Sequence, residues 1–220
     1  MSAKSNLRFV IVPGNGGGEV TRANWYGWLA KKLEDAGLTC LLRNMPDPVQ
    51  ARESVWLPFM EKELGCDQNT VIVGHSSGAE AAMRFAETRK VHSLVLVSAC
   101  MTDLGMESER VSGYYSRPWL WEEIKANCKV KVAQFGSRDD PFIPFEEQEQ
   151  VATGLDSQFF QHTDKGHFMN STFPELLKYL KDLSEDDRHV SSQEFQNKTR
   201  KGCLELGGDK KRELCPSRSF

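Results

Sequence analysis

The pentapeptide Gly-His-Ser-Ser-Gly at 74–78 constrains the fold of this chain more than any other part of the sequence. It follows an apolar run at 70–73 and precedes a helical pattern over 79–86. A Gly-x-Ser-x-Gly pattern between a strand and a helix is typical of a nucleophile elbow, a sharp turn that exposes the serine Oγ above the sheet edge. The glycines are needed because side chains two residues before and after Ser76 would collide with the neighbouring strand or helix.

Short apolar runs alternate with helical patterns along most of the chain, and this alternation predicts the fold class. Strands are predicted at 9–12, 39–42, 71–73, 94–97, 130–135 and 159–162. Several of these runs are apolar almost throughout, as is typical of a parallel sheet that is covered on both faces. We therefore expect an α/β protein with a doubly wound, mainly parallel six-stranded sheet and helices on both faces. Ligands of such sheets bind beyond the carboxyl ends of the strands.

Composition excludes several other classes of protein. The 220 residues are 39% hydrophobic and 27% charged with a net charge of −3, which predicts no general attraction to nucleic acid or membrane surfaces. No run approaches the roughly 20 apolar residues that span a bilayer, and the first apolar run is too short for a signal peptide. We expect a cytoplasmic protein, with the nucleus as an alternative. Six cysteines without Cys-x-x-Cys spacing predict free thiols and no metal site.

The character of the sequence changes at about residue 184. Residues 185–220 are rich in charged and polar side chains and show no sustained apolar periodicity. Such a segment cannot bury enough apolar surface to offset the entropy lost on ordering. The sequence therefore predicts one folded domain over 1–184 and a disordered, charged C-terminal tail over 185–220.

Ser76 needs a base, because a serine hydroxyl is a weak nucleophile at neutral pH. Histidines occur at 75, 92, 162, 167 and 189. His167 follows the last predicted strand and therefore lies at the same sheet edge as Ser76. His75 lies inside the turn and points away from the neighbouring Oγ, and the other three lie in an apolar run, at the opposite edge or in the tail. We expect His167 to be the base.

The base needs an acidic partner that holds its tautomer and stabilises the imidazolium ion. Asp140 follows the predicted strand at 130–135 and precedes a proline, which restricts its backbone to an extended conformation. The neighbouring Asp139 could instead form a turn or pair with Arg138, so we expect Asp140 to be the partner. The resulting chain order of Ser76, Asp140 and His167 is that of α/β-hydrolases.

An oxyanion that forms at Ser76 needs hydrogen-bond donors. One donor is expected to be the backbone N–H of Ser77, the residue after the nucleophile. The second is expected from the glycine-rich loop at 13–18, from either Asn15 or Gly16. This loop lacks the lysine of a phosphate-binding P-loop, and Glu19 occupies the position of the third glycine in the dinucleotide-binding pattern.

These residues predict a serine hydrolase that cleaves small carboxylic esters or amides through an acyl-enzyme on Ser76, with no metal or organic cofactor. The alternative is an interaction protein that keeps the fold and works through a partner. Aromatic residues follow the strands that end near this edge, and they could line an apolar acyl pocket or belong to the core: Tyr114, Tyr115, Trp119, Trp121 and Phe142.

Eight segments within residues 8–183 resemble a family of small α/β-hydrolase-fold serine hydrolases whose members bind the retinoblastoma protein. They are VPGNGGG at 12–18, WYGW at 25–28, NMPDP at 44–48, ARES at 51–54, GHSSG at 74–78, RPW at 117–119, DDPF at 139–142 and GHF at 166–168. The resemblance implies serine hydrolase activity with Ser76, Asp140 and His167 as the triad. It also implies association with the retinoblastoma protein through a Leu-x-Cys-x-Glu motif.

The segment that corresponds to this motif departs from it. Leu64 and Cys66 are present, but Gln68 stands where the motif has glutamate. The loss of a carboxylate removes a charge-assisted contact worth roughly 1.5–3 kcal/mol. Leu64 also ends a predicted helix and could belong to the core. The sequence therefore predicts weakened binding to the retinoblastoma protein.

Overall fold

A computed structural model describes residues 7–16 and 18–206 of the chain. The described residues form one sheet of six parallel strands in the order β2-β1-β3-β4-β5-β6. This confirms the predicted doubly wound sheet. The strands are β1 (Arg8–Val12), β2 (Thr39–Leu42), β3 (Thr70–His75), β4 (Ser93–Val97), β5 (Ala133–Ser137) and β6 (Gln158–His162).

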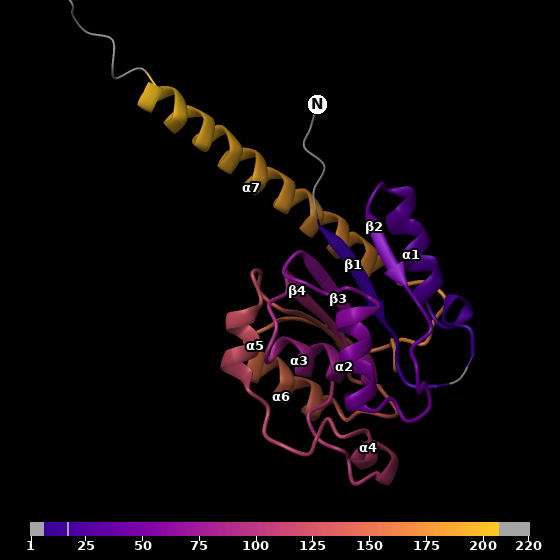
Figure 1. The fold of residues 1–220 in the computed structure, drawn as a ribbon. Coiled ribbons are helices and arrows are strands. Elements are labelled where there is room, and N and C mark those ends of the chain that lie inside the picture. Colours follow the sequence, from indigo (N-terminus) through magenta and orange to yellow (C-terminus); the bar gives the residue numbers. More distant parts are fainter. Residues whose placement is uncertain (1–6, 17, 207–220) are drawn as a thin grey trace, which may run out of the picture. The chain divides into compact units, whose positions relative to one another are not determined.

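Helices cover both faces of the sheet (Figure 1). Helices α2, α3, α5 and α6 lie side by side in one layer, whereas α1 packs on the opposite face beside β2. The short helix α4 lies beyond the carboxyl ends of the strands. The helices are η1 (Val20–Arg22, 3-10), α1 (Tyr26–Asp35), α2 (Glu53–Lys62), α3 (Ser77–Ala86), α4 (Glu107–Ser112), α5 (Trp121–Asn127), α6 (Phe145–Leu155) and α7 (Pro174–Leu206).

Successive side chains along each strand point alternately to the two faces of the sheet. Val10, Ile72 and Leu94 point into the core on the side of α2, α3, α5 and α6. Phe9 and Val71 are equally buried but point to the other side. Because β1, β3 and β4 carry buried apolar side chains on both faces, the centre of the sheet is covered on both sides.

Leu64 and Cys66 belong to this core. Their exposed fractions are 1% and 8%, and both pack in the same cluster as Trp56 and Met60 of α2. The two side chains that the retinoblastoma-binding motif would present to a partner are therefore covered by the protein itself.

Helix α7 crosses the boundary between two compact units of the chain. Residues 6–179 form the first unit, and the rest of α7 belongs to the second. The helix continues to Leu206, so residues 185–206 are helical where the sequence predicts no regular structure. These residues include many strong helix formers and no proline. Their helix propensity explains why a helix forms here although the sequence has no apolar stripe. Residues 207–220 lie outside the described residues, and the division of the chain at residue 184 stays a prediction.

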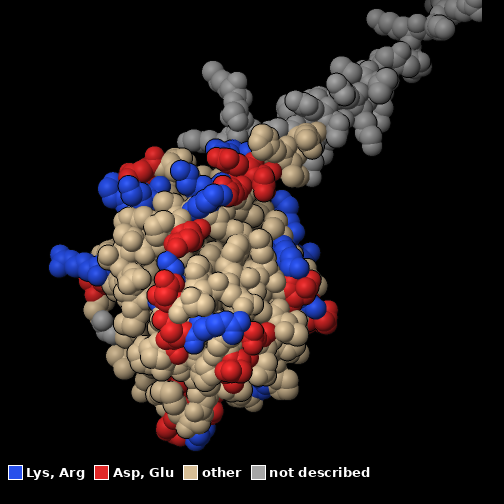
Figure 2. Space-filling view, turned by 180° about the vertical axis from the view of Figure 1, so that it is seen from behind, with Lys and Arg blue, Asp and Glu red and all other residues tan. Residues whose placement is uncertain are grey.

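Acidic and basic side chains are interspersed on the face of the protein that Figure 2 shows. That face carries no large area of a single sign, as the near-neutral balance of charges leads one to expect. Among the described residues, no helix combines the length and the apolar character that crossing a bilayer requires.

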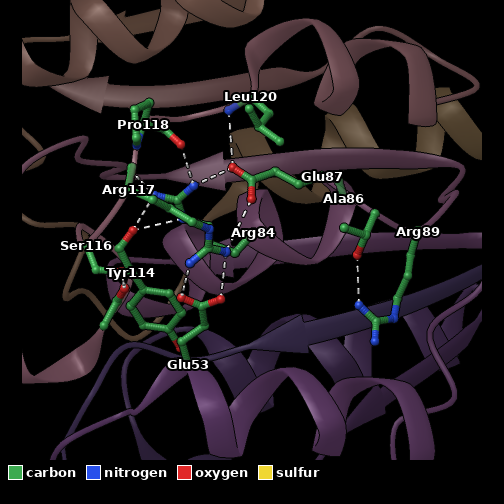
Figure 3. A network of polar contacts seen from close by, with 12 residues as sticks. Glu53, Arg84, Ala86, Glu87, Arg89, Tyr114, Ser116, Arg117, Pro118 and Leu120 are labelled. Carbon is green, nitrogen blue, oxygen red and sulfur yellow. Dashed lines mark hydrogen bonds and ion pairs between the residues drawn. The ribbon is translucent and has the colours of Figure 1, made fainter.

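A buried arginine ties helix α3 to the segment between α4 and α5 (Figure 3). The guanidinium of Arg84 donates to the carbonyl oxygens of Tyr114 at 2.8 Å, Pro118 at 3.0 Å and Arg117 at 2.6 Å. It also pairs with Glu87 and lies 3.7 Å from the centre of the Trp119 ring. These contacts satisfy a cation that is fully buried, and they fix the segment against α3.

A second arginine extends this network to helix α2. Arg117 binds both carboxylate oxygens of Glu53, at 2.7 and 2.8 Å, and contacts Glu87 at 3.3 Å. Bidentate pairs of this kind add geometric specificity to the ion pair. The two arginines and two glutamates therefore join α2, α3 and the 113–120 segment.

Replacement of Arg84 by methionine tests the importance of the network. The variant should lose about 3–5 kcal/mol of unfolding free energy, because Glu87 keeps its buried charge and three carbonyl oxygens lose their donor. The matched control is Lys31→Met, which breaks the exposed Lys31–Asp35 pair on α1 and should cost less than about 1 kcal/mol. Urea denaturation measures both values, and equal losses would contradict this account.

Candidate active site

Ser76 occupies the turn between β3 and α3 with φ 52° and ψ −127°, a conformation that side-chain-bearing residues rarely adopt. Close packing explains the two flanking glycines. A Cβ on Gly74 would lie 2.3 Å from the carbonyl oxygen of Gly78, and a Cβ on Gly78 would lie 2.2 Å from that of Val12. No larger residue fits at either position, which confirms the steric reasoning applied to the sequence.

His167 and Asp140 form a hydrogen-bonded pair at the carboxyl edge of the sheet. Nδ1 of His167 lies 2.9 and 3.0 Å from the two carboxylate oxygens of Asp140. The Asp140 side chain is fully buried, and its Oδ1 also accepts the backbone N–H groups of Phe142 and Ile143. Burial alone would raise the pKa of Asp140, but these hydrogen bonds and the nearby imidazole outweigh it and lower the pKa. Asp140 therefore stays ionised as a partner for His167.

Asp139 has a different role from its neighbour. Its Oδ1 accepts the hydroxyl of Ser137 at 2.5 Å and the backbone N–H of Gly166 at 2.9 Å. Through these two hydrogen bonds, Asp139 holds the loop that carries His167 close to the end of β5. The alternative pairing with Arg138 is not what the structure describes, since that arginine contacts Gln161 at 2.9 Å.

Ser76 and His167 line the same cavity, which has a volume of about 350 Å³. Asn15 and Ser77 line it as well, so four of the residues expected at the site face one space. They come from the loop after β1, the elbow after β3 and the loop after β6. The carboxyl ends of these parallel strands meet at one edge, and their loops therefore converge.

The glycine-rich loop approaches the elbow closely. A Cβ on Gly14 would lie 3.2 Å from Cβ of Ser76. Asn15 lines the cavity, whereas Gly16 lines a neighbouring hollow and donates its backbone N–H to the carbonyl of Pro48 at 2.7 Å. That bond occupies the Gly16 N–H, so the geometry favours Asn15 of the two alternatives.

The wall of the cavity comes from the segment 100–115 and from the loop after β5. Of the aromatic residues that the sequence singled out, Tyr115 and Phe142 line the cavity. Tyr114 and Trp119 instead belong to the core, and Trp121 packs against it. Sequence position near the site could not separate these two groups, because neighbours in one segment point in opposite directions.

Glu80 is a cavity residue that sequence reasoning missed. It lies one helical turn after Ser76 on α3, is 1% exposed and accepts the backbone N–H of Cys100 at 2.8 Å. Burial and the nearby carboxylates of Glu109 and Glu147 raise its pKa well above the usual range. The raised pKa favours the protonated carboxyl group, which can donate a hydrogen bond as well as accept one.

The described residues offer no cluster of three or more His, Cys, Asp and Glu side chains that could hold a metal ion. The structure describes the side chains of four cysteines, and all four are free thiols: Cys40, Cys66, Cys100 and Cys128. Burial raises the pKa of each of these thiols, so they lack the thiolate character of reactive cysteines. The chemistry of the cavity therefore belongs to its oxygen and imidazole groups.

His75 is a buried residue of the cavity lining and contacts both sides of the site. One ring nitrogen, Nε2, lies 2.9 Å from the carbonyl oxygen of His167, and the other, Nδ1, contacts the hydroxyl of Tyr26. Burial and the nearby His167 lower the pKa of His75 to about 3. The ring is therefore neutral over the physiological range. Neither Tyr26 nor this use of His75 was predicted, since the contacts join residues that are far apart in sequence.

Two sequence comparisons relate the chain to known proteins. The family described as serine hydrolase matches residues 9–182. Serine hydrolase RBBP9 of Rattus norvegicus is 59% identical over 180 residues, which cover 81% of this chain and 96% of that protein. Putative hydrolase YdeN of Bacillus subtilis (strain 168) is 29% identical over 154 residues, 66% of this chain and 78% of that protein. The resemblance inferred from the motifs is confirmed.

Solved structures agree with these matches. The crystal structure of the ydeN gene product from B. subtilis has a TM-score of 0.73 at 25% identity and covers 80% of this chain and 98% of its own. A thermophilic esterase from Thermogutta terrifontis has a TM-score of 0.59 at 17% identity, with 84% and 91% covered. The second match shows the fold alone, and it is the α/β-hydrolase fold that the sequence predicts.

The buried neutral His75 predicts a specific dependence of stability on pH. Its pKa is lower in the folded protein, at about 3, than in the unfolded chain, at about 6.5. Below pH 6.5 the unfolded chain therefore binds a proton at His75 that the folded protein does not bind. The free energy of unfolding decreases as the pH is lowered from about 6.5 to about 3, where the folded protein also takes up the proton. Compared with His75→Gln, the wild type should lose about 2 kcal/mol more between pH 7.5 and pH 5.

Urea denaturation of both proteins at several pH values measures this difference. Subtraction of the two curves cancels the contributions of the surface carboxylates, which the two proteins share. A difference that stays constant between pH 7.5 and pH 5 would contradict the assignment of a neutral buried ring.

Proposed function

The chain belongs to the serine hydrolase family, and we propose that it hydrolyses small carboxylic esters or amides through an acyl-enzyme on Ser76. The observation that carries the proposal is the hydrogen-bonded pair of His167 and Asp140, with His167 facing the same cavity as Ser76. A base held in one tautomer by a buried carboxylate is what an activated serine needs.

In the proposed reaction, Ser76 Oγ attacks the carbonyl carbon of the substrate and His167 takes the hydroxyl proton. Asp140 accepts the Nδ1–H of His167 and stabilises the imidazolium that forms. His167 then returns the proton to the leaving alcohol or amine as the C–O or C–N bond breaks. Water attacks the acyl-enzyme in the same way and releases the acid, which regenerates Ser76.

The negative charge on the carbonyl oxygen is proposed to be held by the backbone N–H groups of Ser77 and Asn15. Ser77 is the first residue of α3, where the free N–H groups and the helix dipole favour negative charge. Asn15 is supported by the close approach of its loop to Ser76 and by its position in the cavity lining. Each such donor is worth about 10²–10³ in kcat in acyl-transfer enzymes.

The described residues do not support the alternative function through a partner. The association with the retinoblastoma protein that the resemblance implies needs exposed side chains, whereas Leu64 and Cys66 are buried. Gln68 also lacks the charge that the motif supplies.

The cytoplasmic location expected from the sequence stays a prediction.

Fluorophosphonate labelling tests the nucleophile. The wild type should be labelled covalently at Ser76, and Ser76→Ala should show no labelling and a kcat about 10⁶ lower with an activated ester. Ser98→Ala is the control, since Ser98 also follows a strand with a positive φ of 50° but does not line the cavity. Equal labelling of the wild type and Ser76→Ala would overturn the proposed function.

A pair of neighbouring substitutions tests which aspartate serves the base. Asp140→Asn should lower kcat about 10⁴-fold, because the amide no longer holds the correct tautomer of His167. Asp139→Asn should cost at most about tenfold, because it disturbs only the contacts with Ser137 and Gly166 and leaves the His167–Asp140 pair in place. Steady-state kinetics on one ester measure both, and a larger loss in Asp139→Asn would reassign the role.

A further inference from the structure

The ring of His75 has a single tautomer that satisfies both of its neighbours. The carbonyl oxygen of His167 only accepts hydrogen bonds, so Nε2 of His75 must carry the proton and donate across 2.9 Å. Nδ1 is then an acceptor, and the hydroxyl of Tyr26 must donate to it. The assignment of tautomer follows from the partners on each side of the ring.

Tyr26 extends this chain of hydrogen bonds to the glycine-rich loop. Its oxygen accepts the backbone N–H of Gly14 at 3.1 Å and the side-chain amide of Asn24 at 3.2 Å. Gly14 directly precedes Asn15, the proposed oxyanion donor. All the bonds run in one direction, from the loop through Tyr26 and His75 to the backbone of His167, and such chains polarise one another favourably.

Three consecutive residues around the base are held by three separate side chains. Asp139 accepts the N–H of Gly166 at 2.9 Å, and Trp25 donates to the carbonyl of Phe168 at 2.9 Å. His75 donates to the carbonyl of His167 between them. The rings of His75 and His167 also lie 5.0 Å apart between their centres. His75 alone of the three contacts the backbone of the base residue itself and also directly precedes Ser76.

The neutral state of His75 suits this position. A positive charge on its ring would repel the imidazolium that His167 becomes during the proposed reaction. A second N–H on the ring would also meet the Tyr26 oxygen, which already accepts two donors. An uncharged donor therefore orients His167 without opposing its protonation.

We propose that His75 is a positioning residue that sets the distance between the glycine-rich loop, Ser76 and the base His167 through its two ring nitrogens. The inference rests on the proposed function of Ser76 and His167. His75 touches no reacting atom in this role, and it acts through the backbone of His167 and through Tyr26.

Two substitutions at His75 separate positioning from packing. Asparagine places an amide near Nδ1 but nothing near Nε2, so His75→Asn should lower kcat on p-nitrophenyl acetate about 10–100-fold with KM changed less than about twofold. Glutamine reaches the Nε2 position and can donate to the carbonyl of His167, so His75→Gln should recover most of that loss. Tyr26→Phe keeps the ring of His75 but removes its donor at Nδ1, and it should also lower kcat with little change in KM.

His92→Asn is the matched control. His92 is another buried histidine, 3% exposed, but it precedes β4 at the opposite edge of the sheet. Its substitution should leave kcat within about twofold of the wild type. Urea denaturation of each variant shows under which conditions it is folded, and the rates are compared under conditions in which all variants are folded.

The outcomes distinguish failure of this inference from failure of the proposed function. If the wild type is labelled at Ser76 and hydrolyses the ester, an unchanged kcat in His75→Asn overturns the inference alone. Equal losses in His75→Asn and His75→Gln, or a loss as large in His92→Asn, also overturn it, because packing would then explain the effect. Equal labelling of the wild type and Ser76→Ala overturns the proposed function, and the positioning role falls with it.

Discussion

The close contact of backbones at the elbow is the constraint on which the rest of the site depends. Gly74 and Gly78 let β3, α3 and the end of β1 approach within distances that no Cβ permits. This contact forces Ser76 into its unusual conformation and brings Gly14 next to it. The loop that is proposed to bind the oxyanion therefore has its place because β1 and β3 are neighbours in the sheet. A looser turn would lose both arrangements together.

Much of this arrangement could be predicted because it depends on local sequence and on parallel-sheet topology. The elbow at Ser76 has a pattern of its own, and the carboxyl ends of parallel strands must lie at one edge. His167 was predicted as the base because it follows a strand that ends at this edge. Asp140 was preferred to Asp139 because the proline after it restricts its backbone. These features need only a few neighbouring residues and one rule of topology.

The remaining features could not be predicted, because they depend on packing between distant segments. Tyr26 meets His75 across 49 positions of the chain, and no spacing in the sequence indicates that contact. The buried state of Glu80 depends on the segment that folds over it. The helix at 185–206 could not be predicted from apolar periodicity, because it has no apolar pattern and depends on the helix propensity of its residues.

The Arg84 network has a consequence for how the cavity can change. Tyr115 of the cavity wall lies in the 113–120 segment, which the buried Arg84 ties to α3, the helix that begins directly after Ser76. Residues that reshape this wall therefore also alter the stability of the fold. Phe142, Met169 and Met106 line the mouth of the same cavity and are 59%, 58% and 49% exposed. Substitutions at these three exposed positions can therefore change the cavity opening without disturbing the buried network that supports its wall.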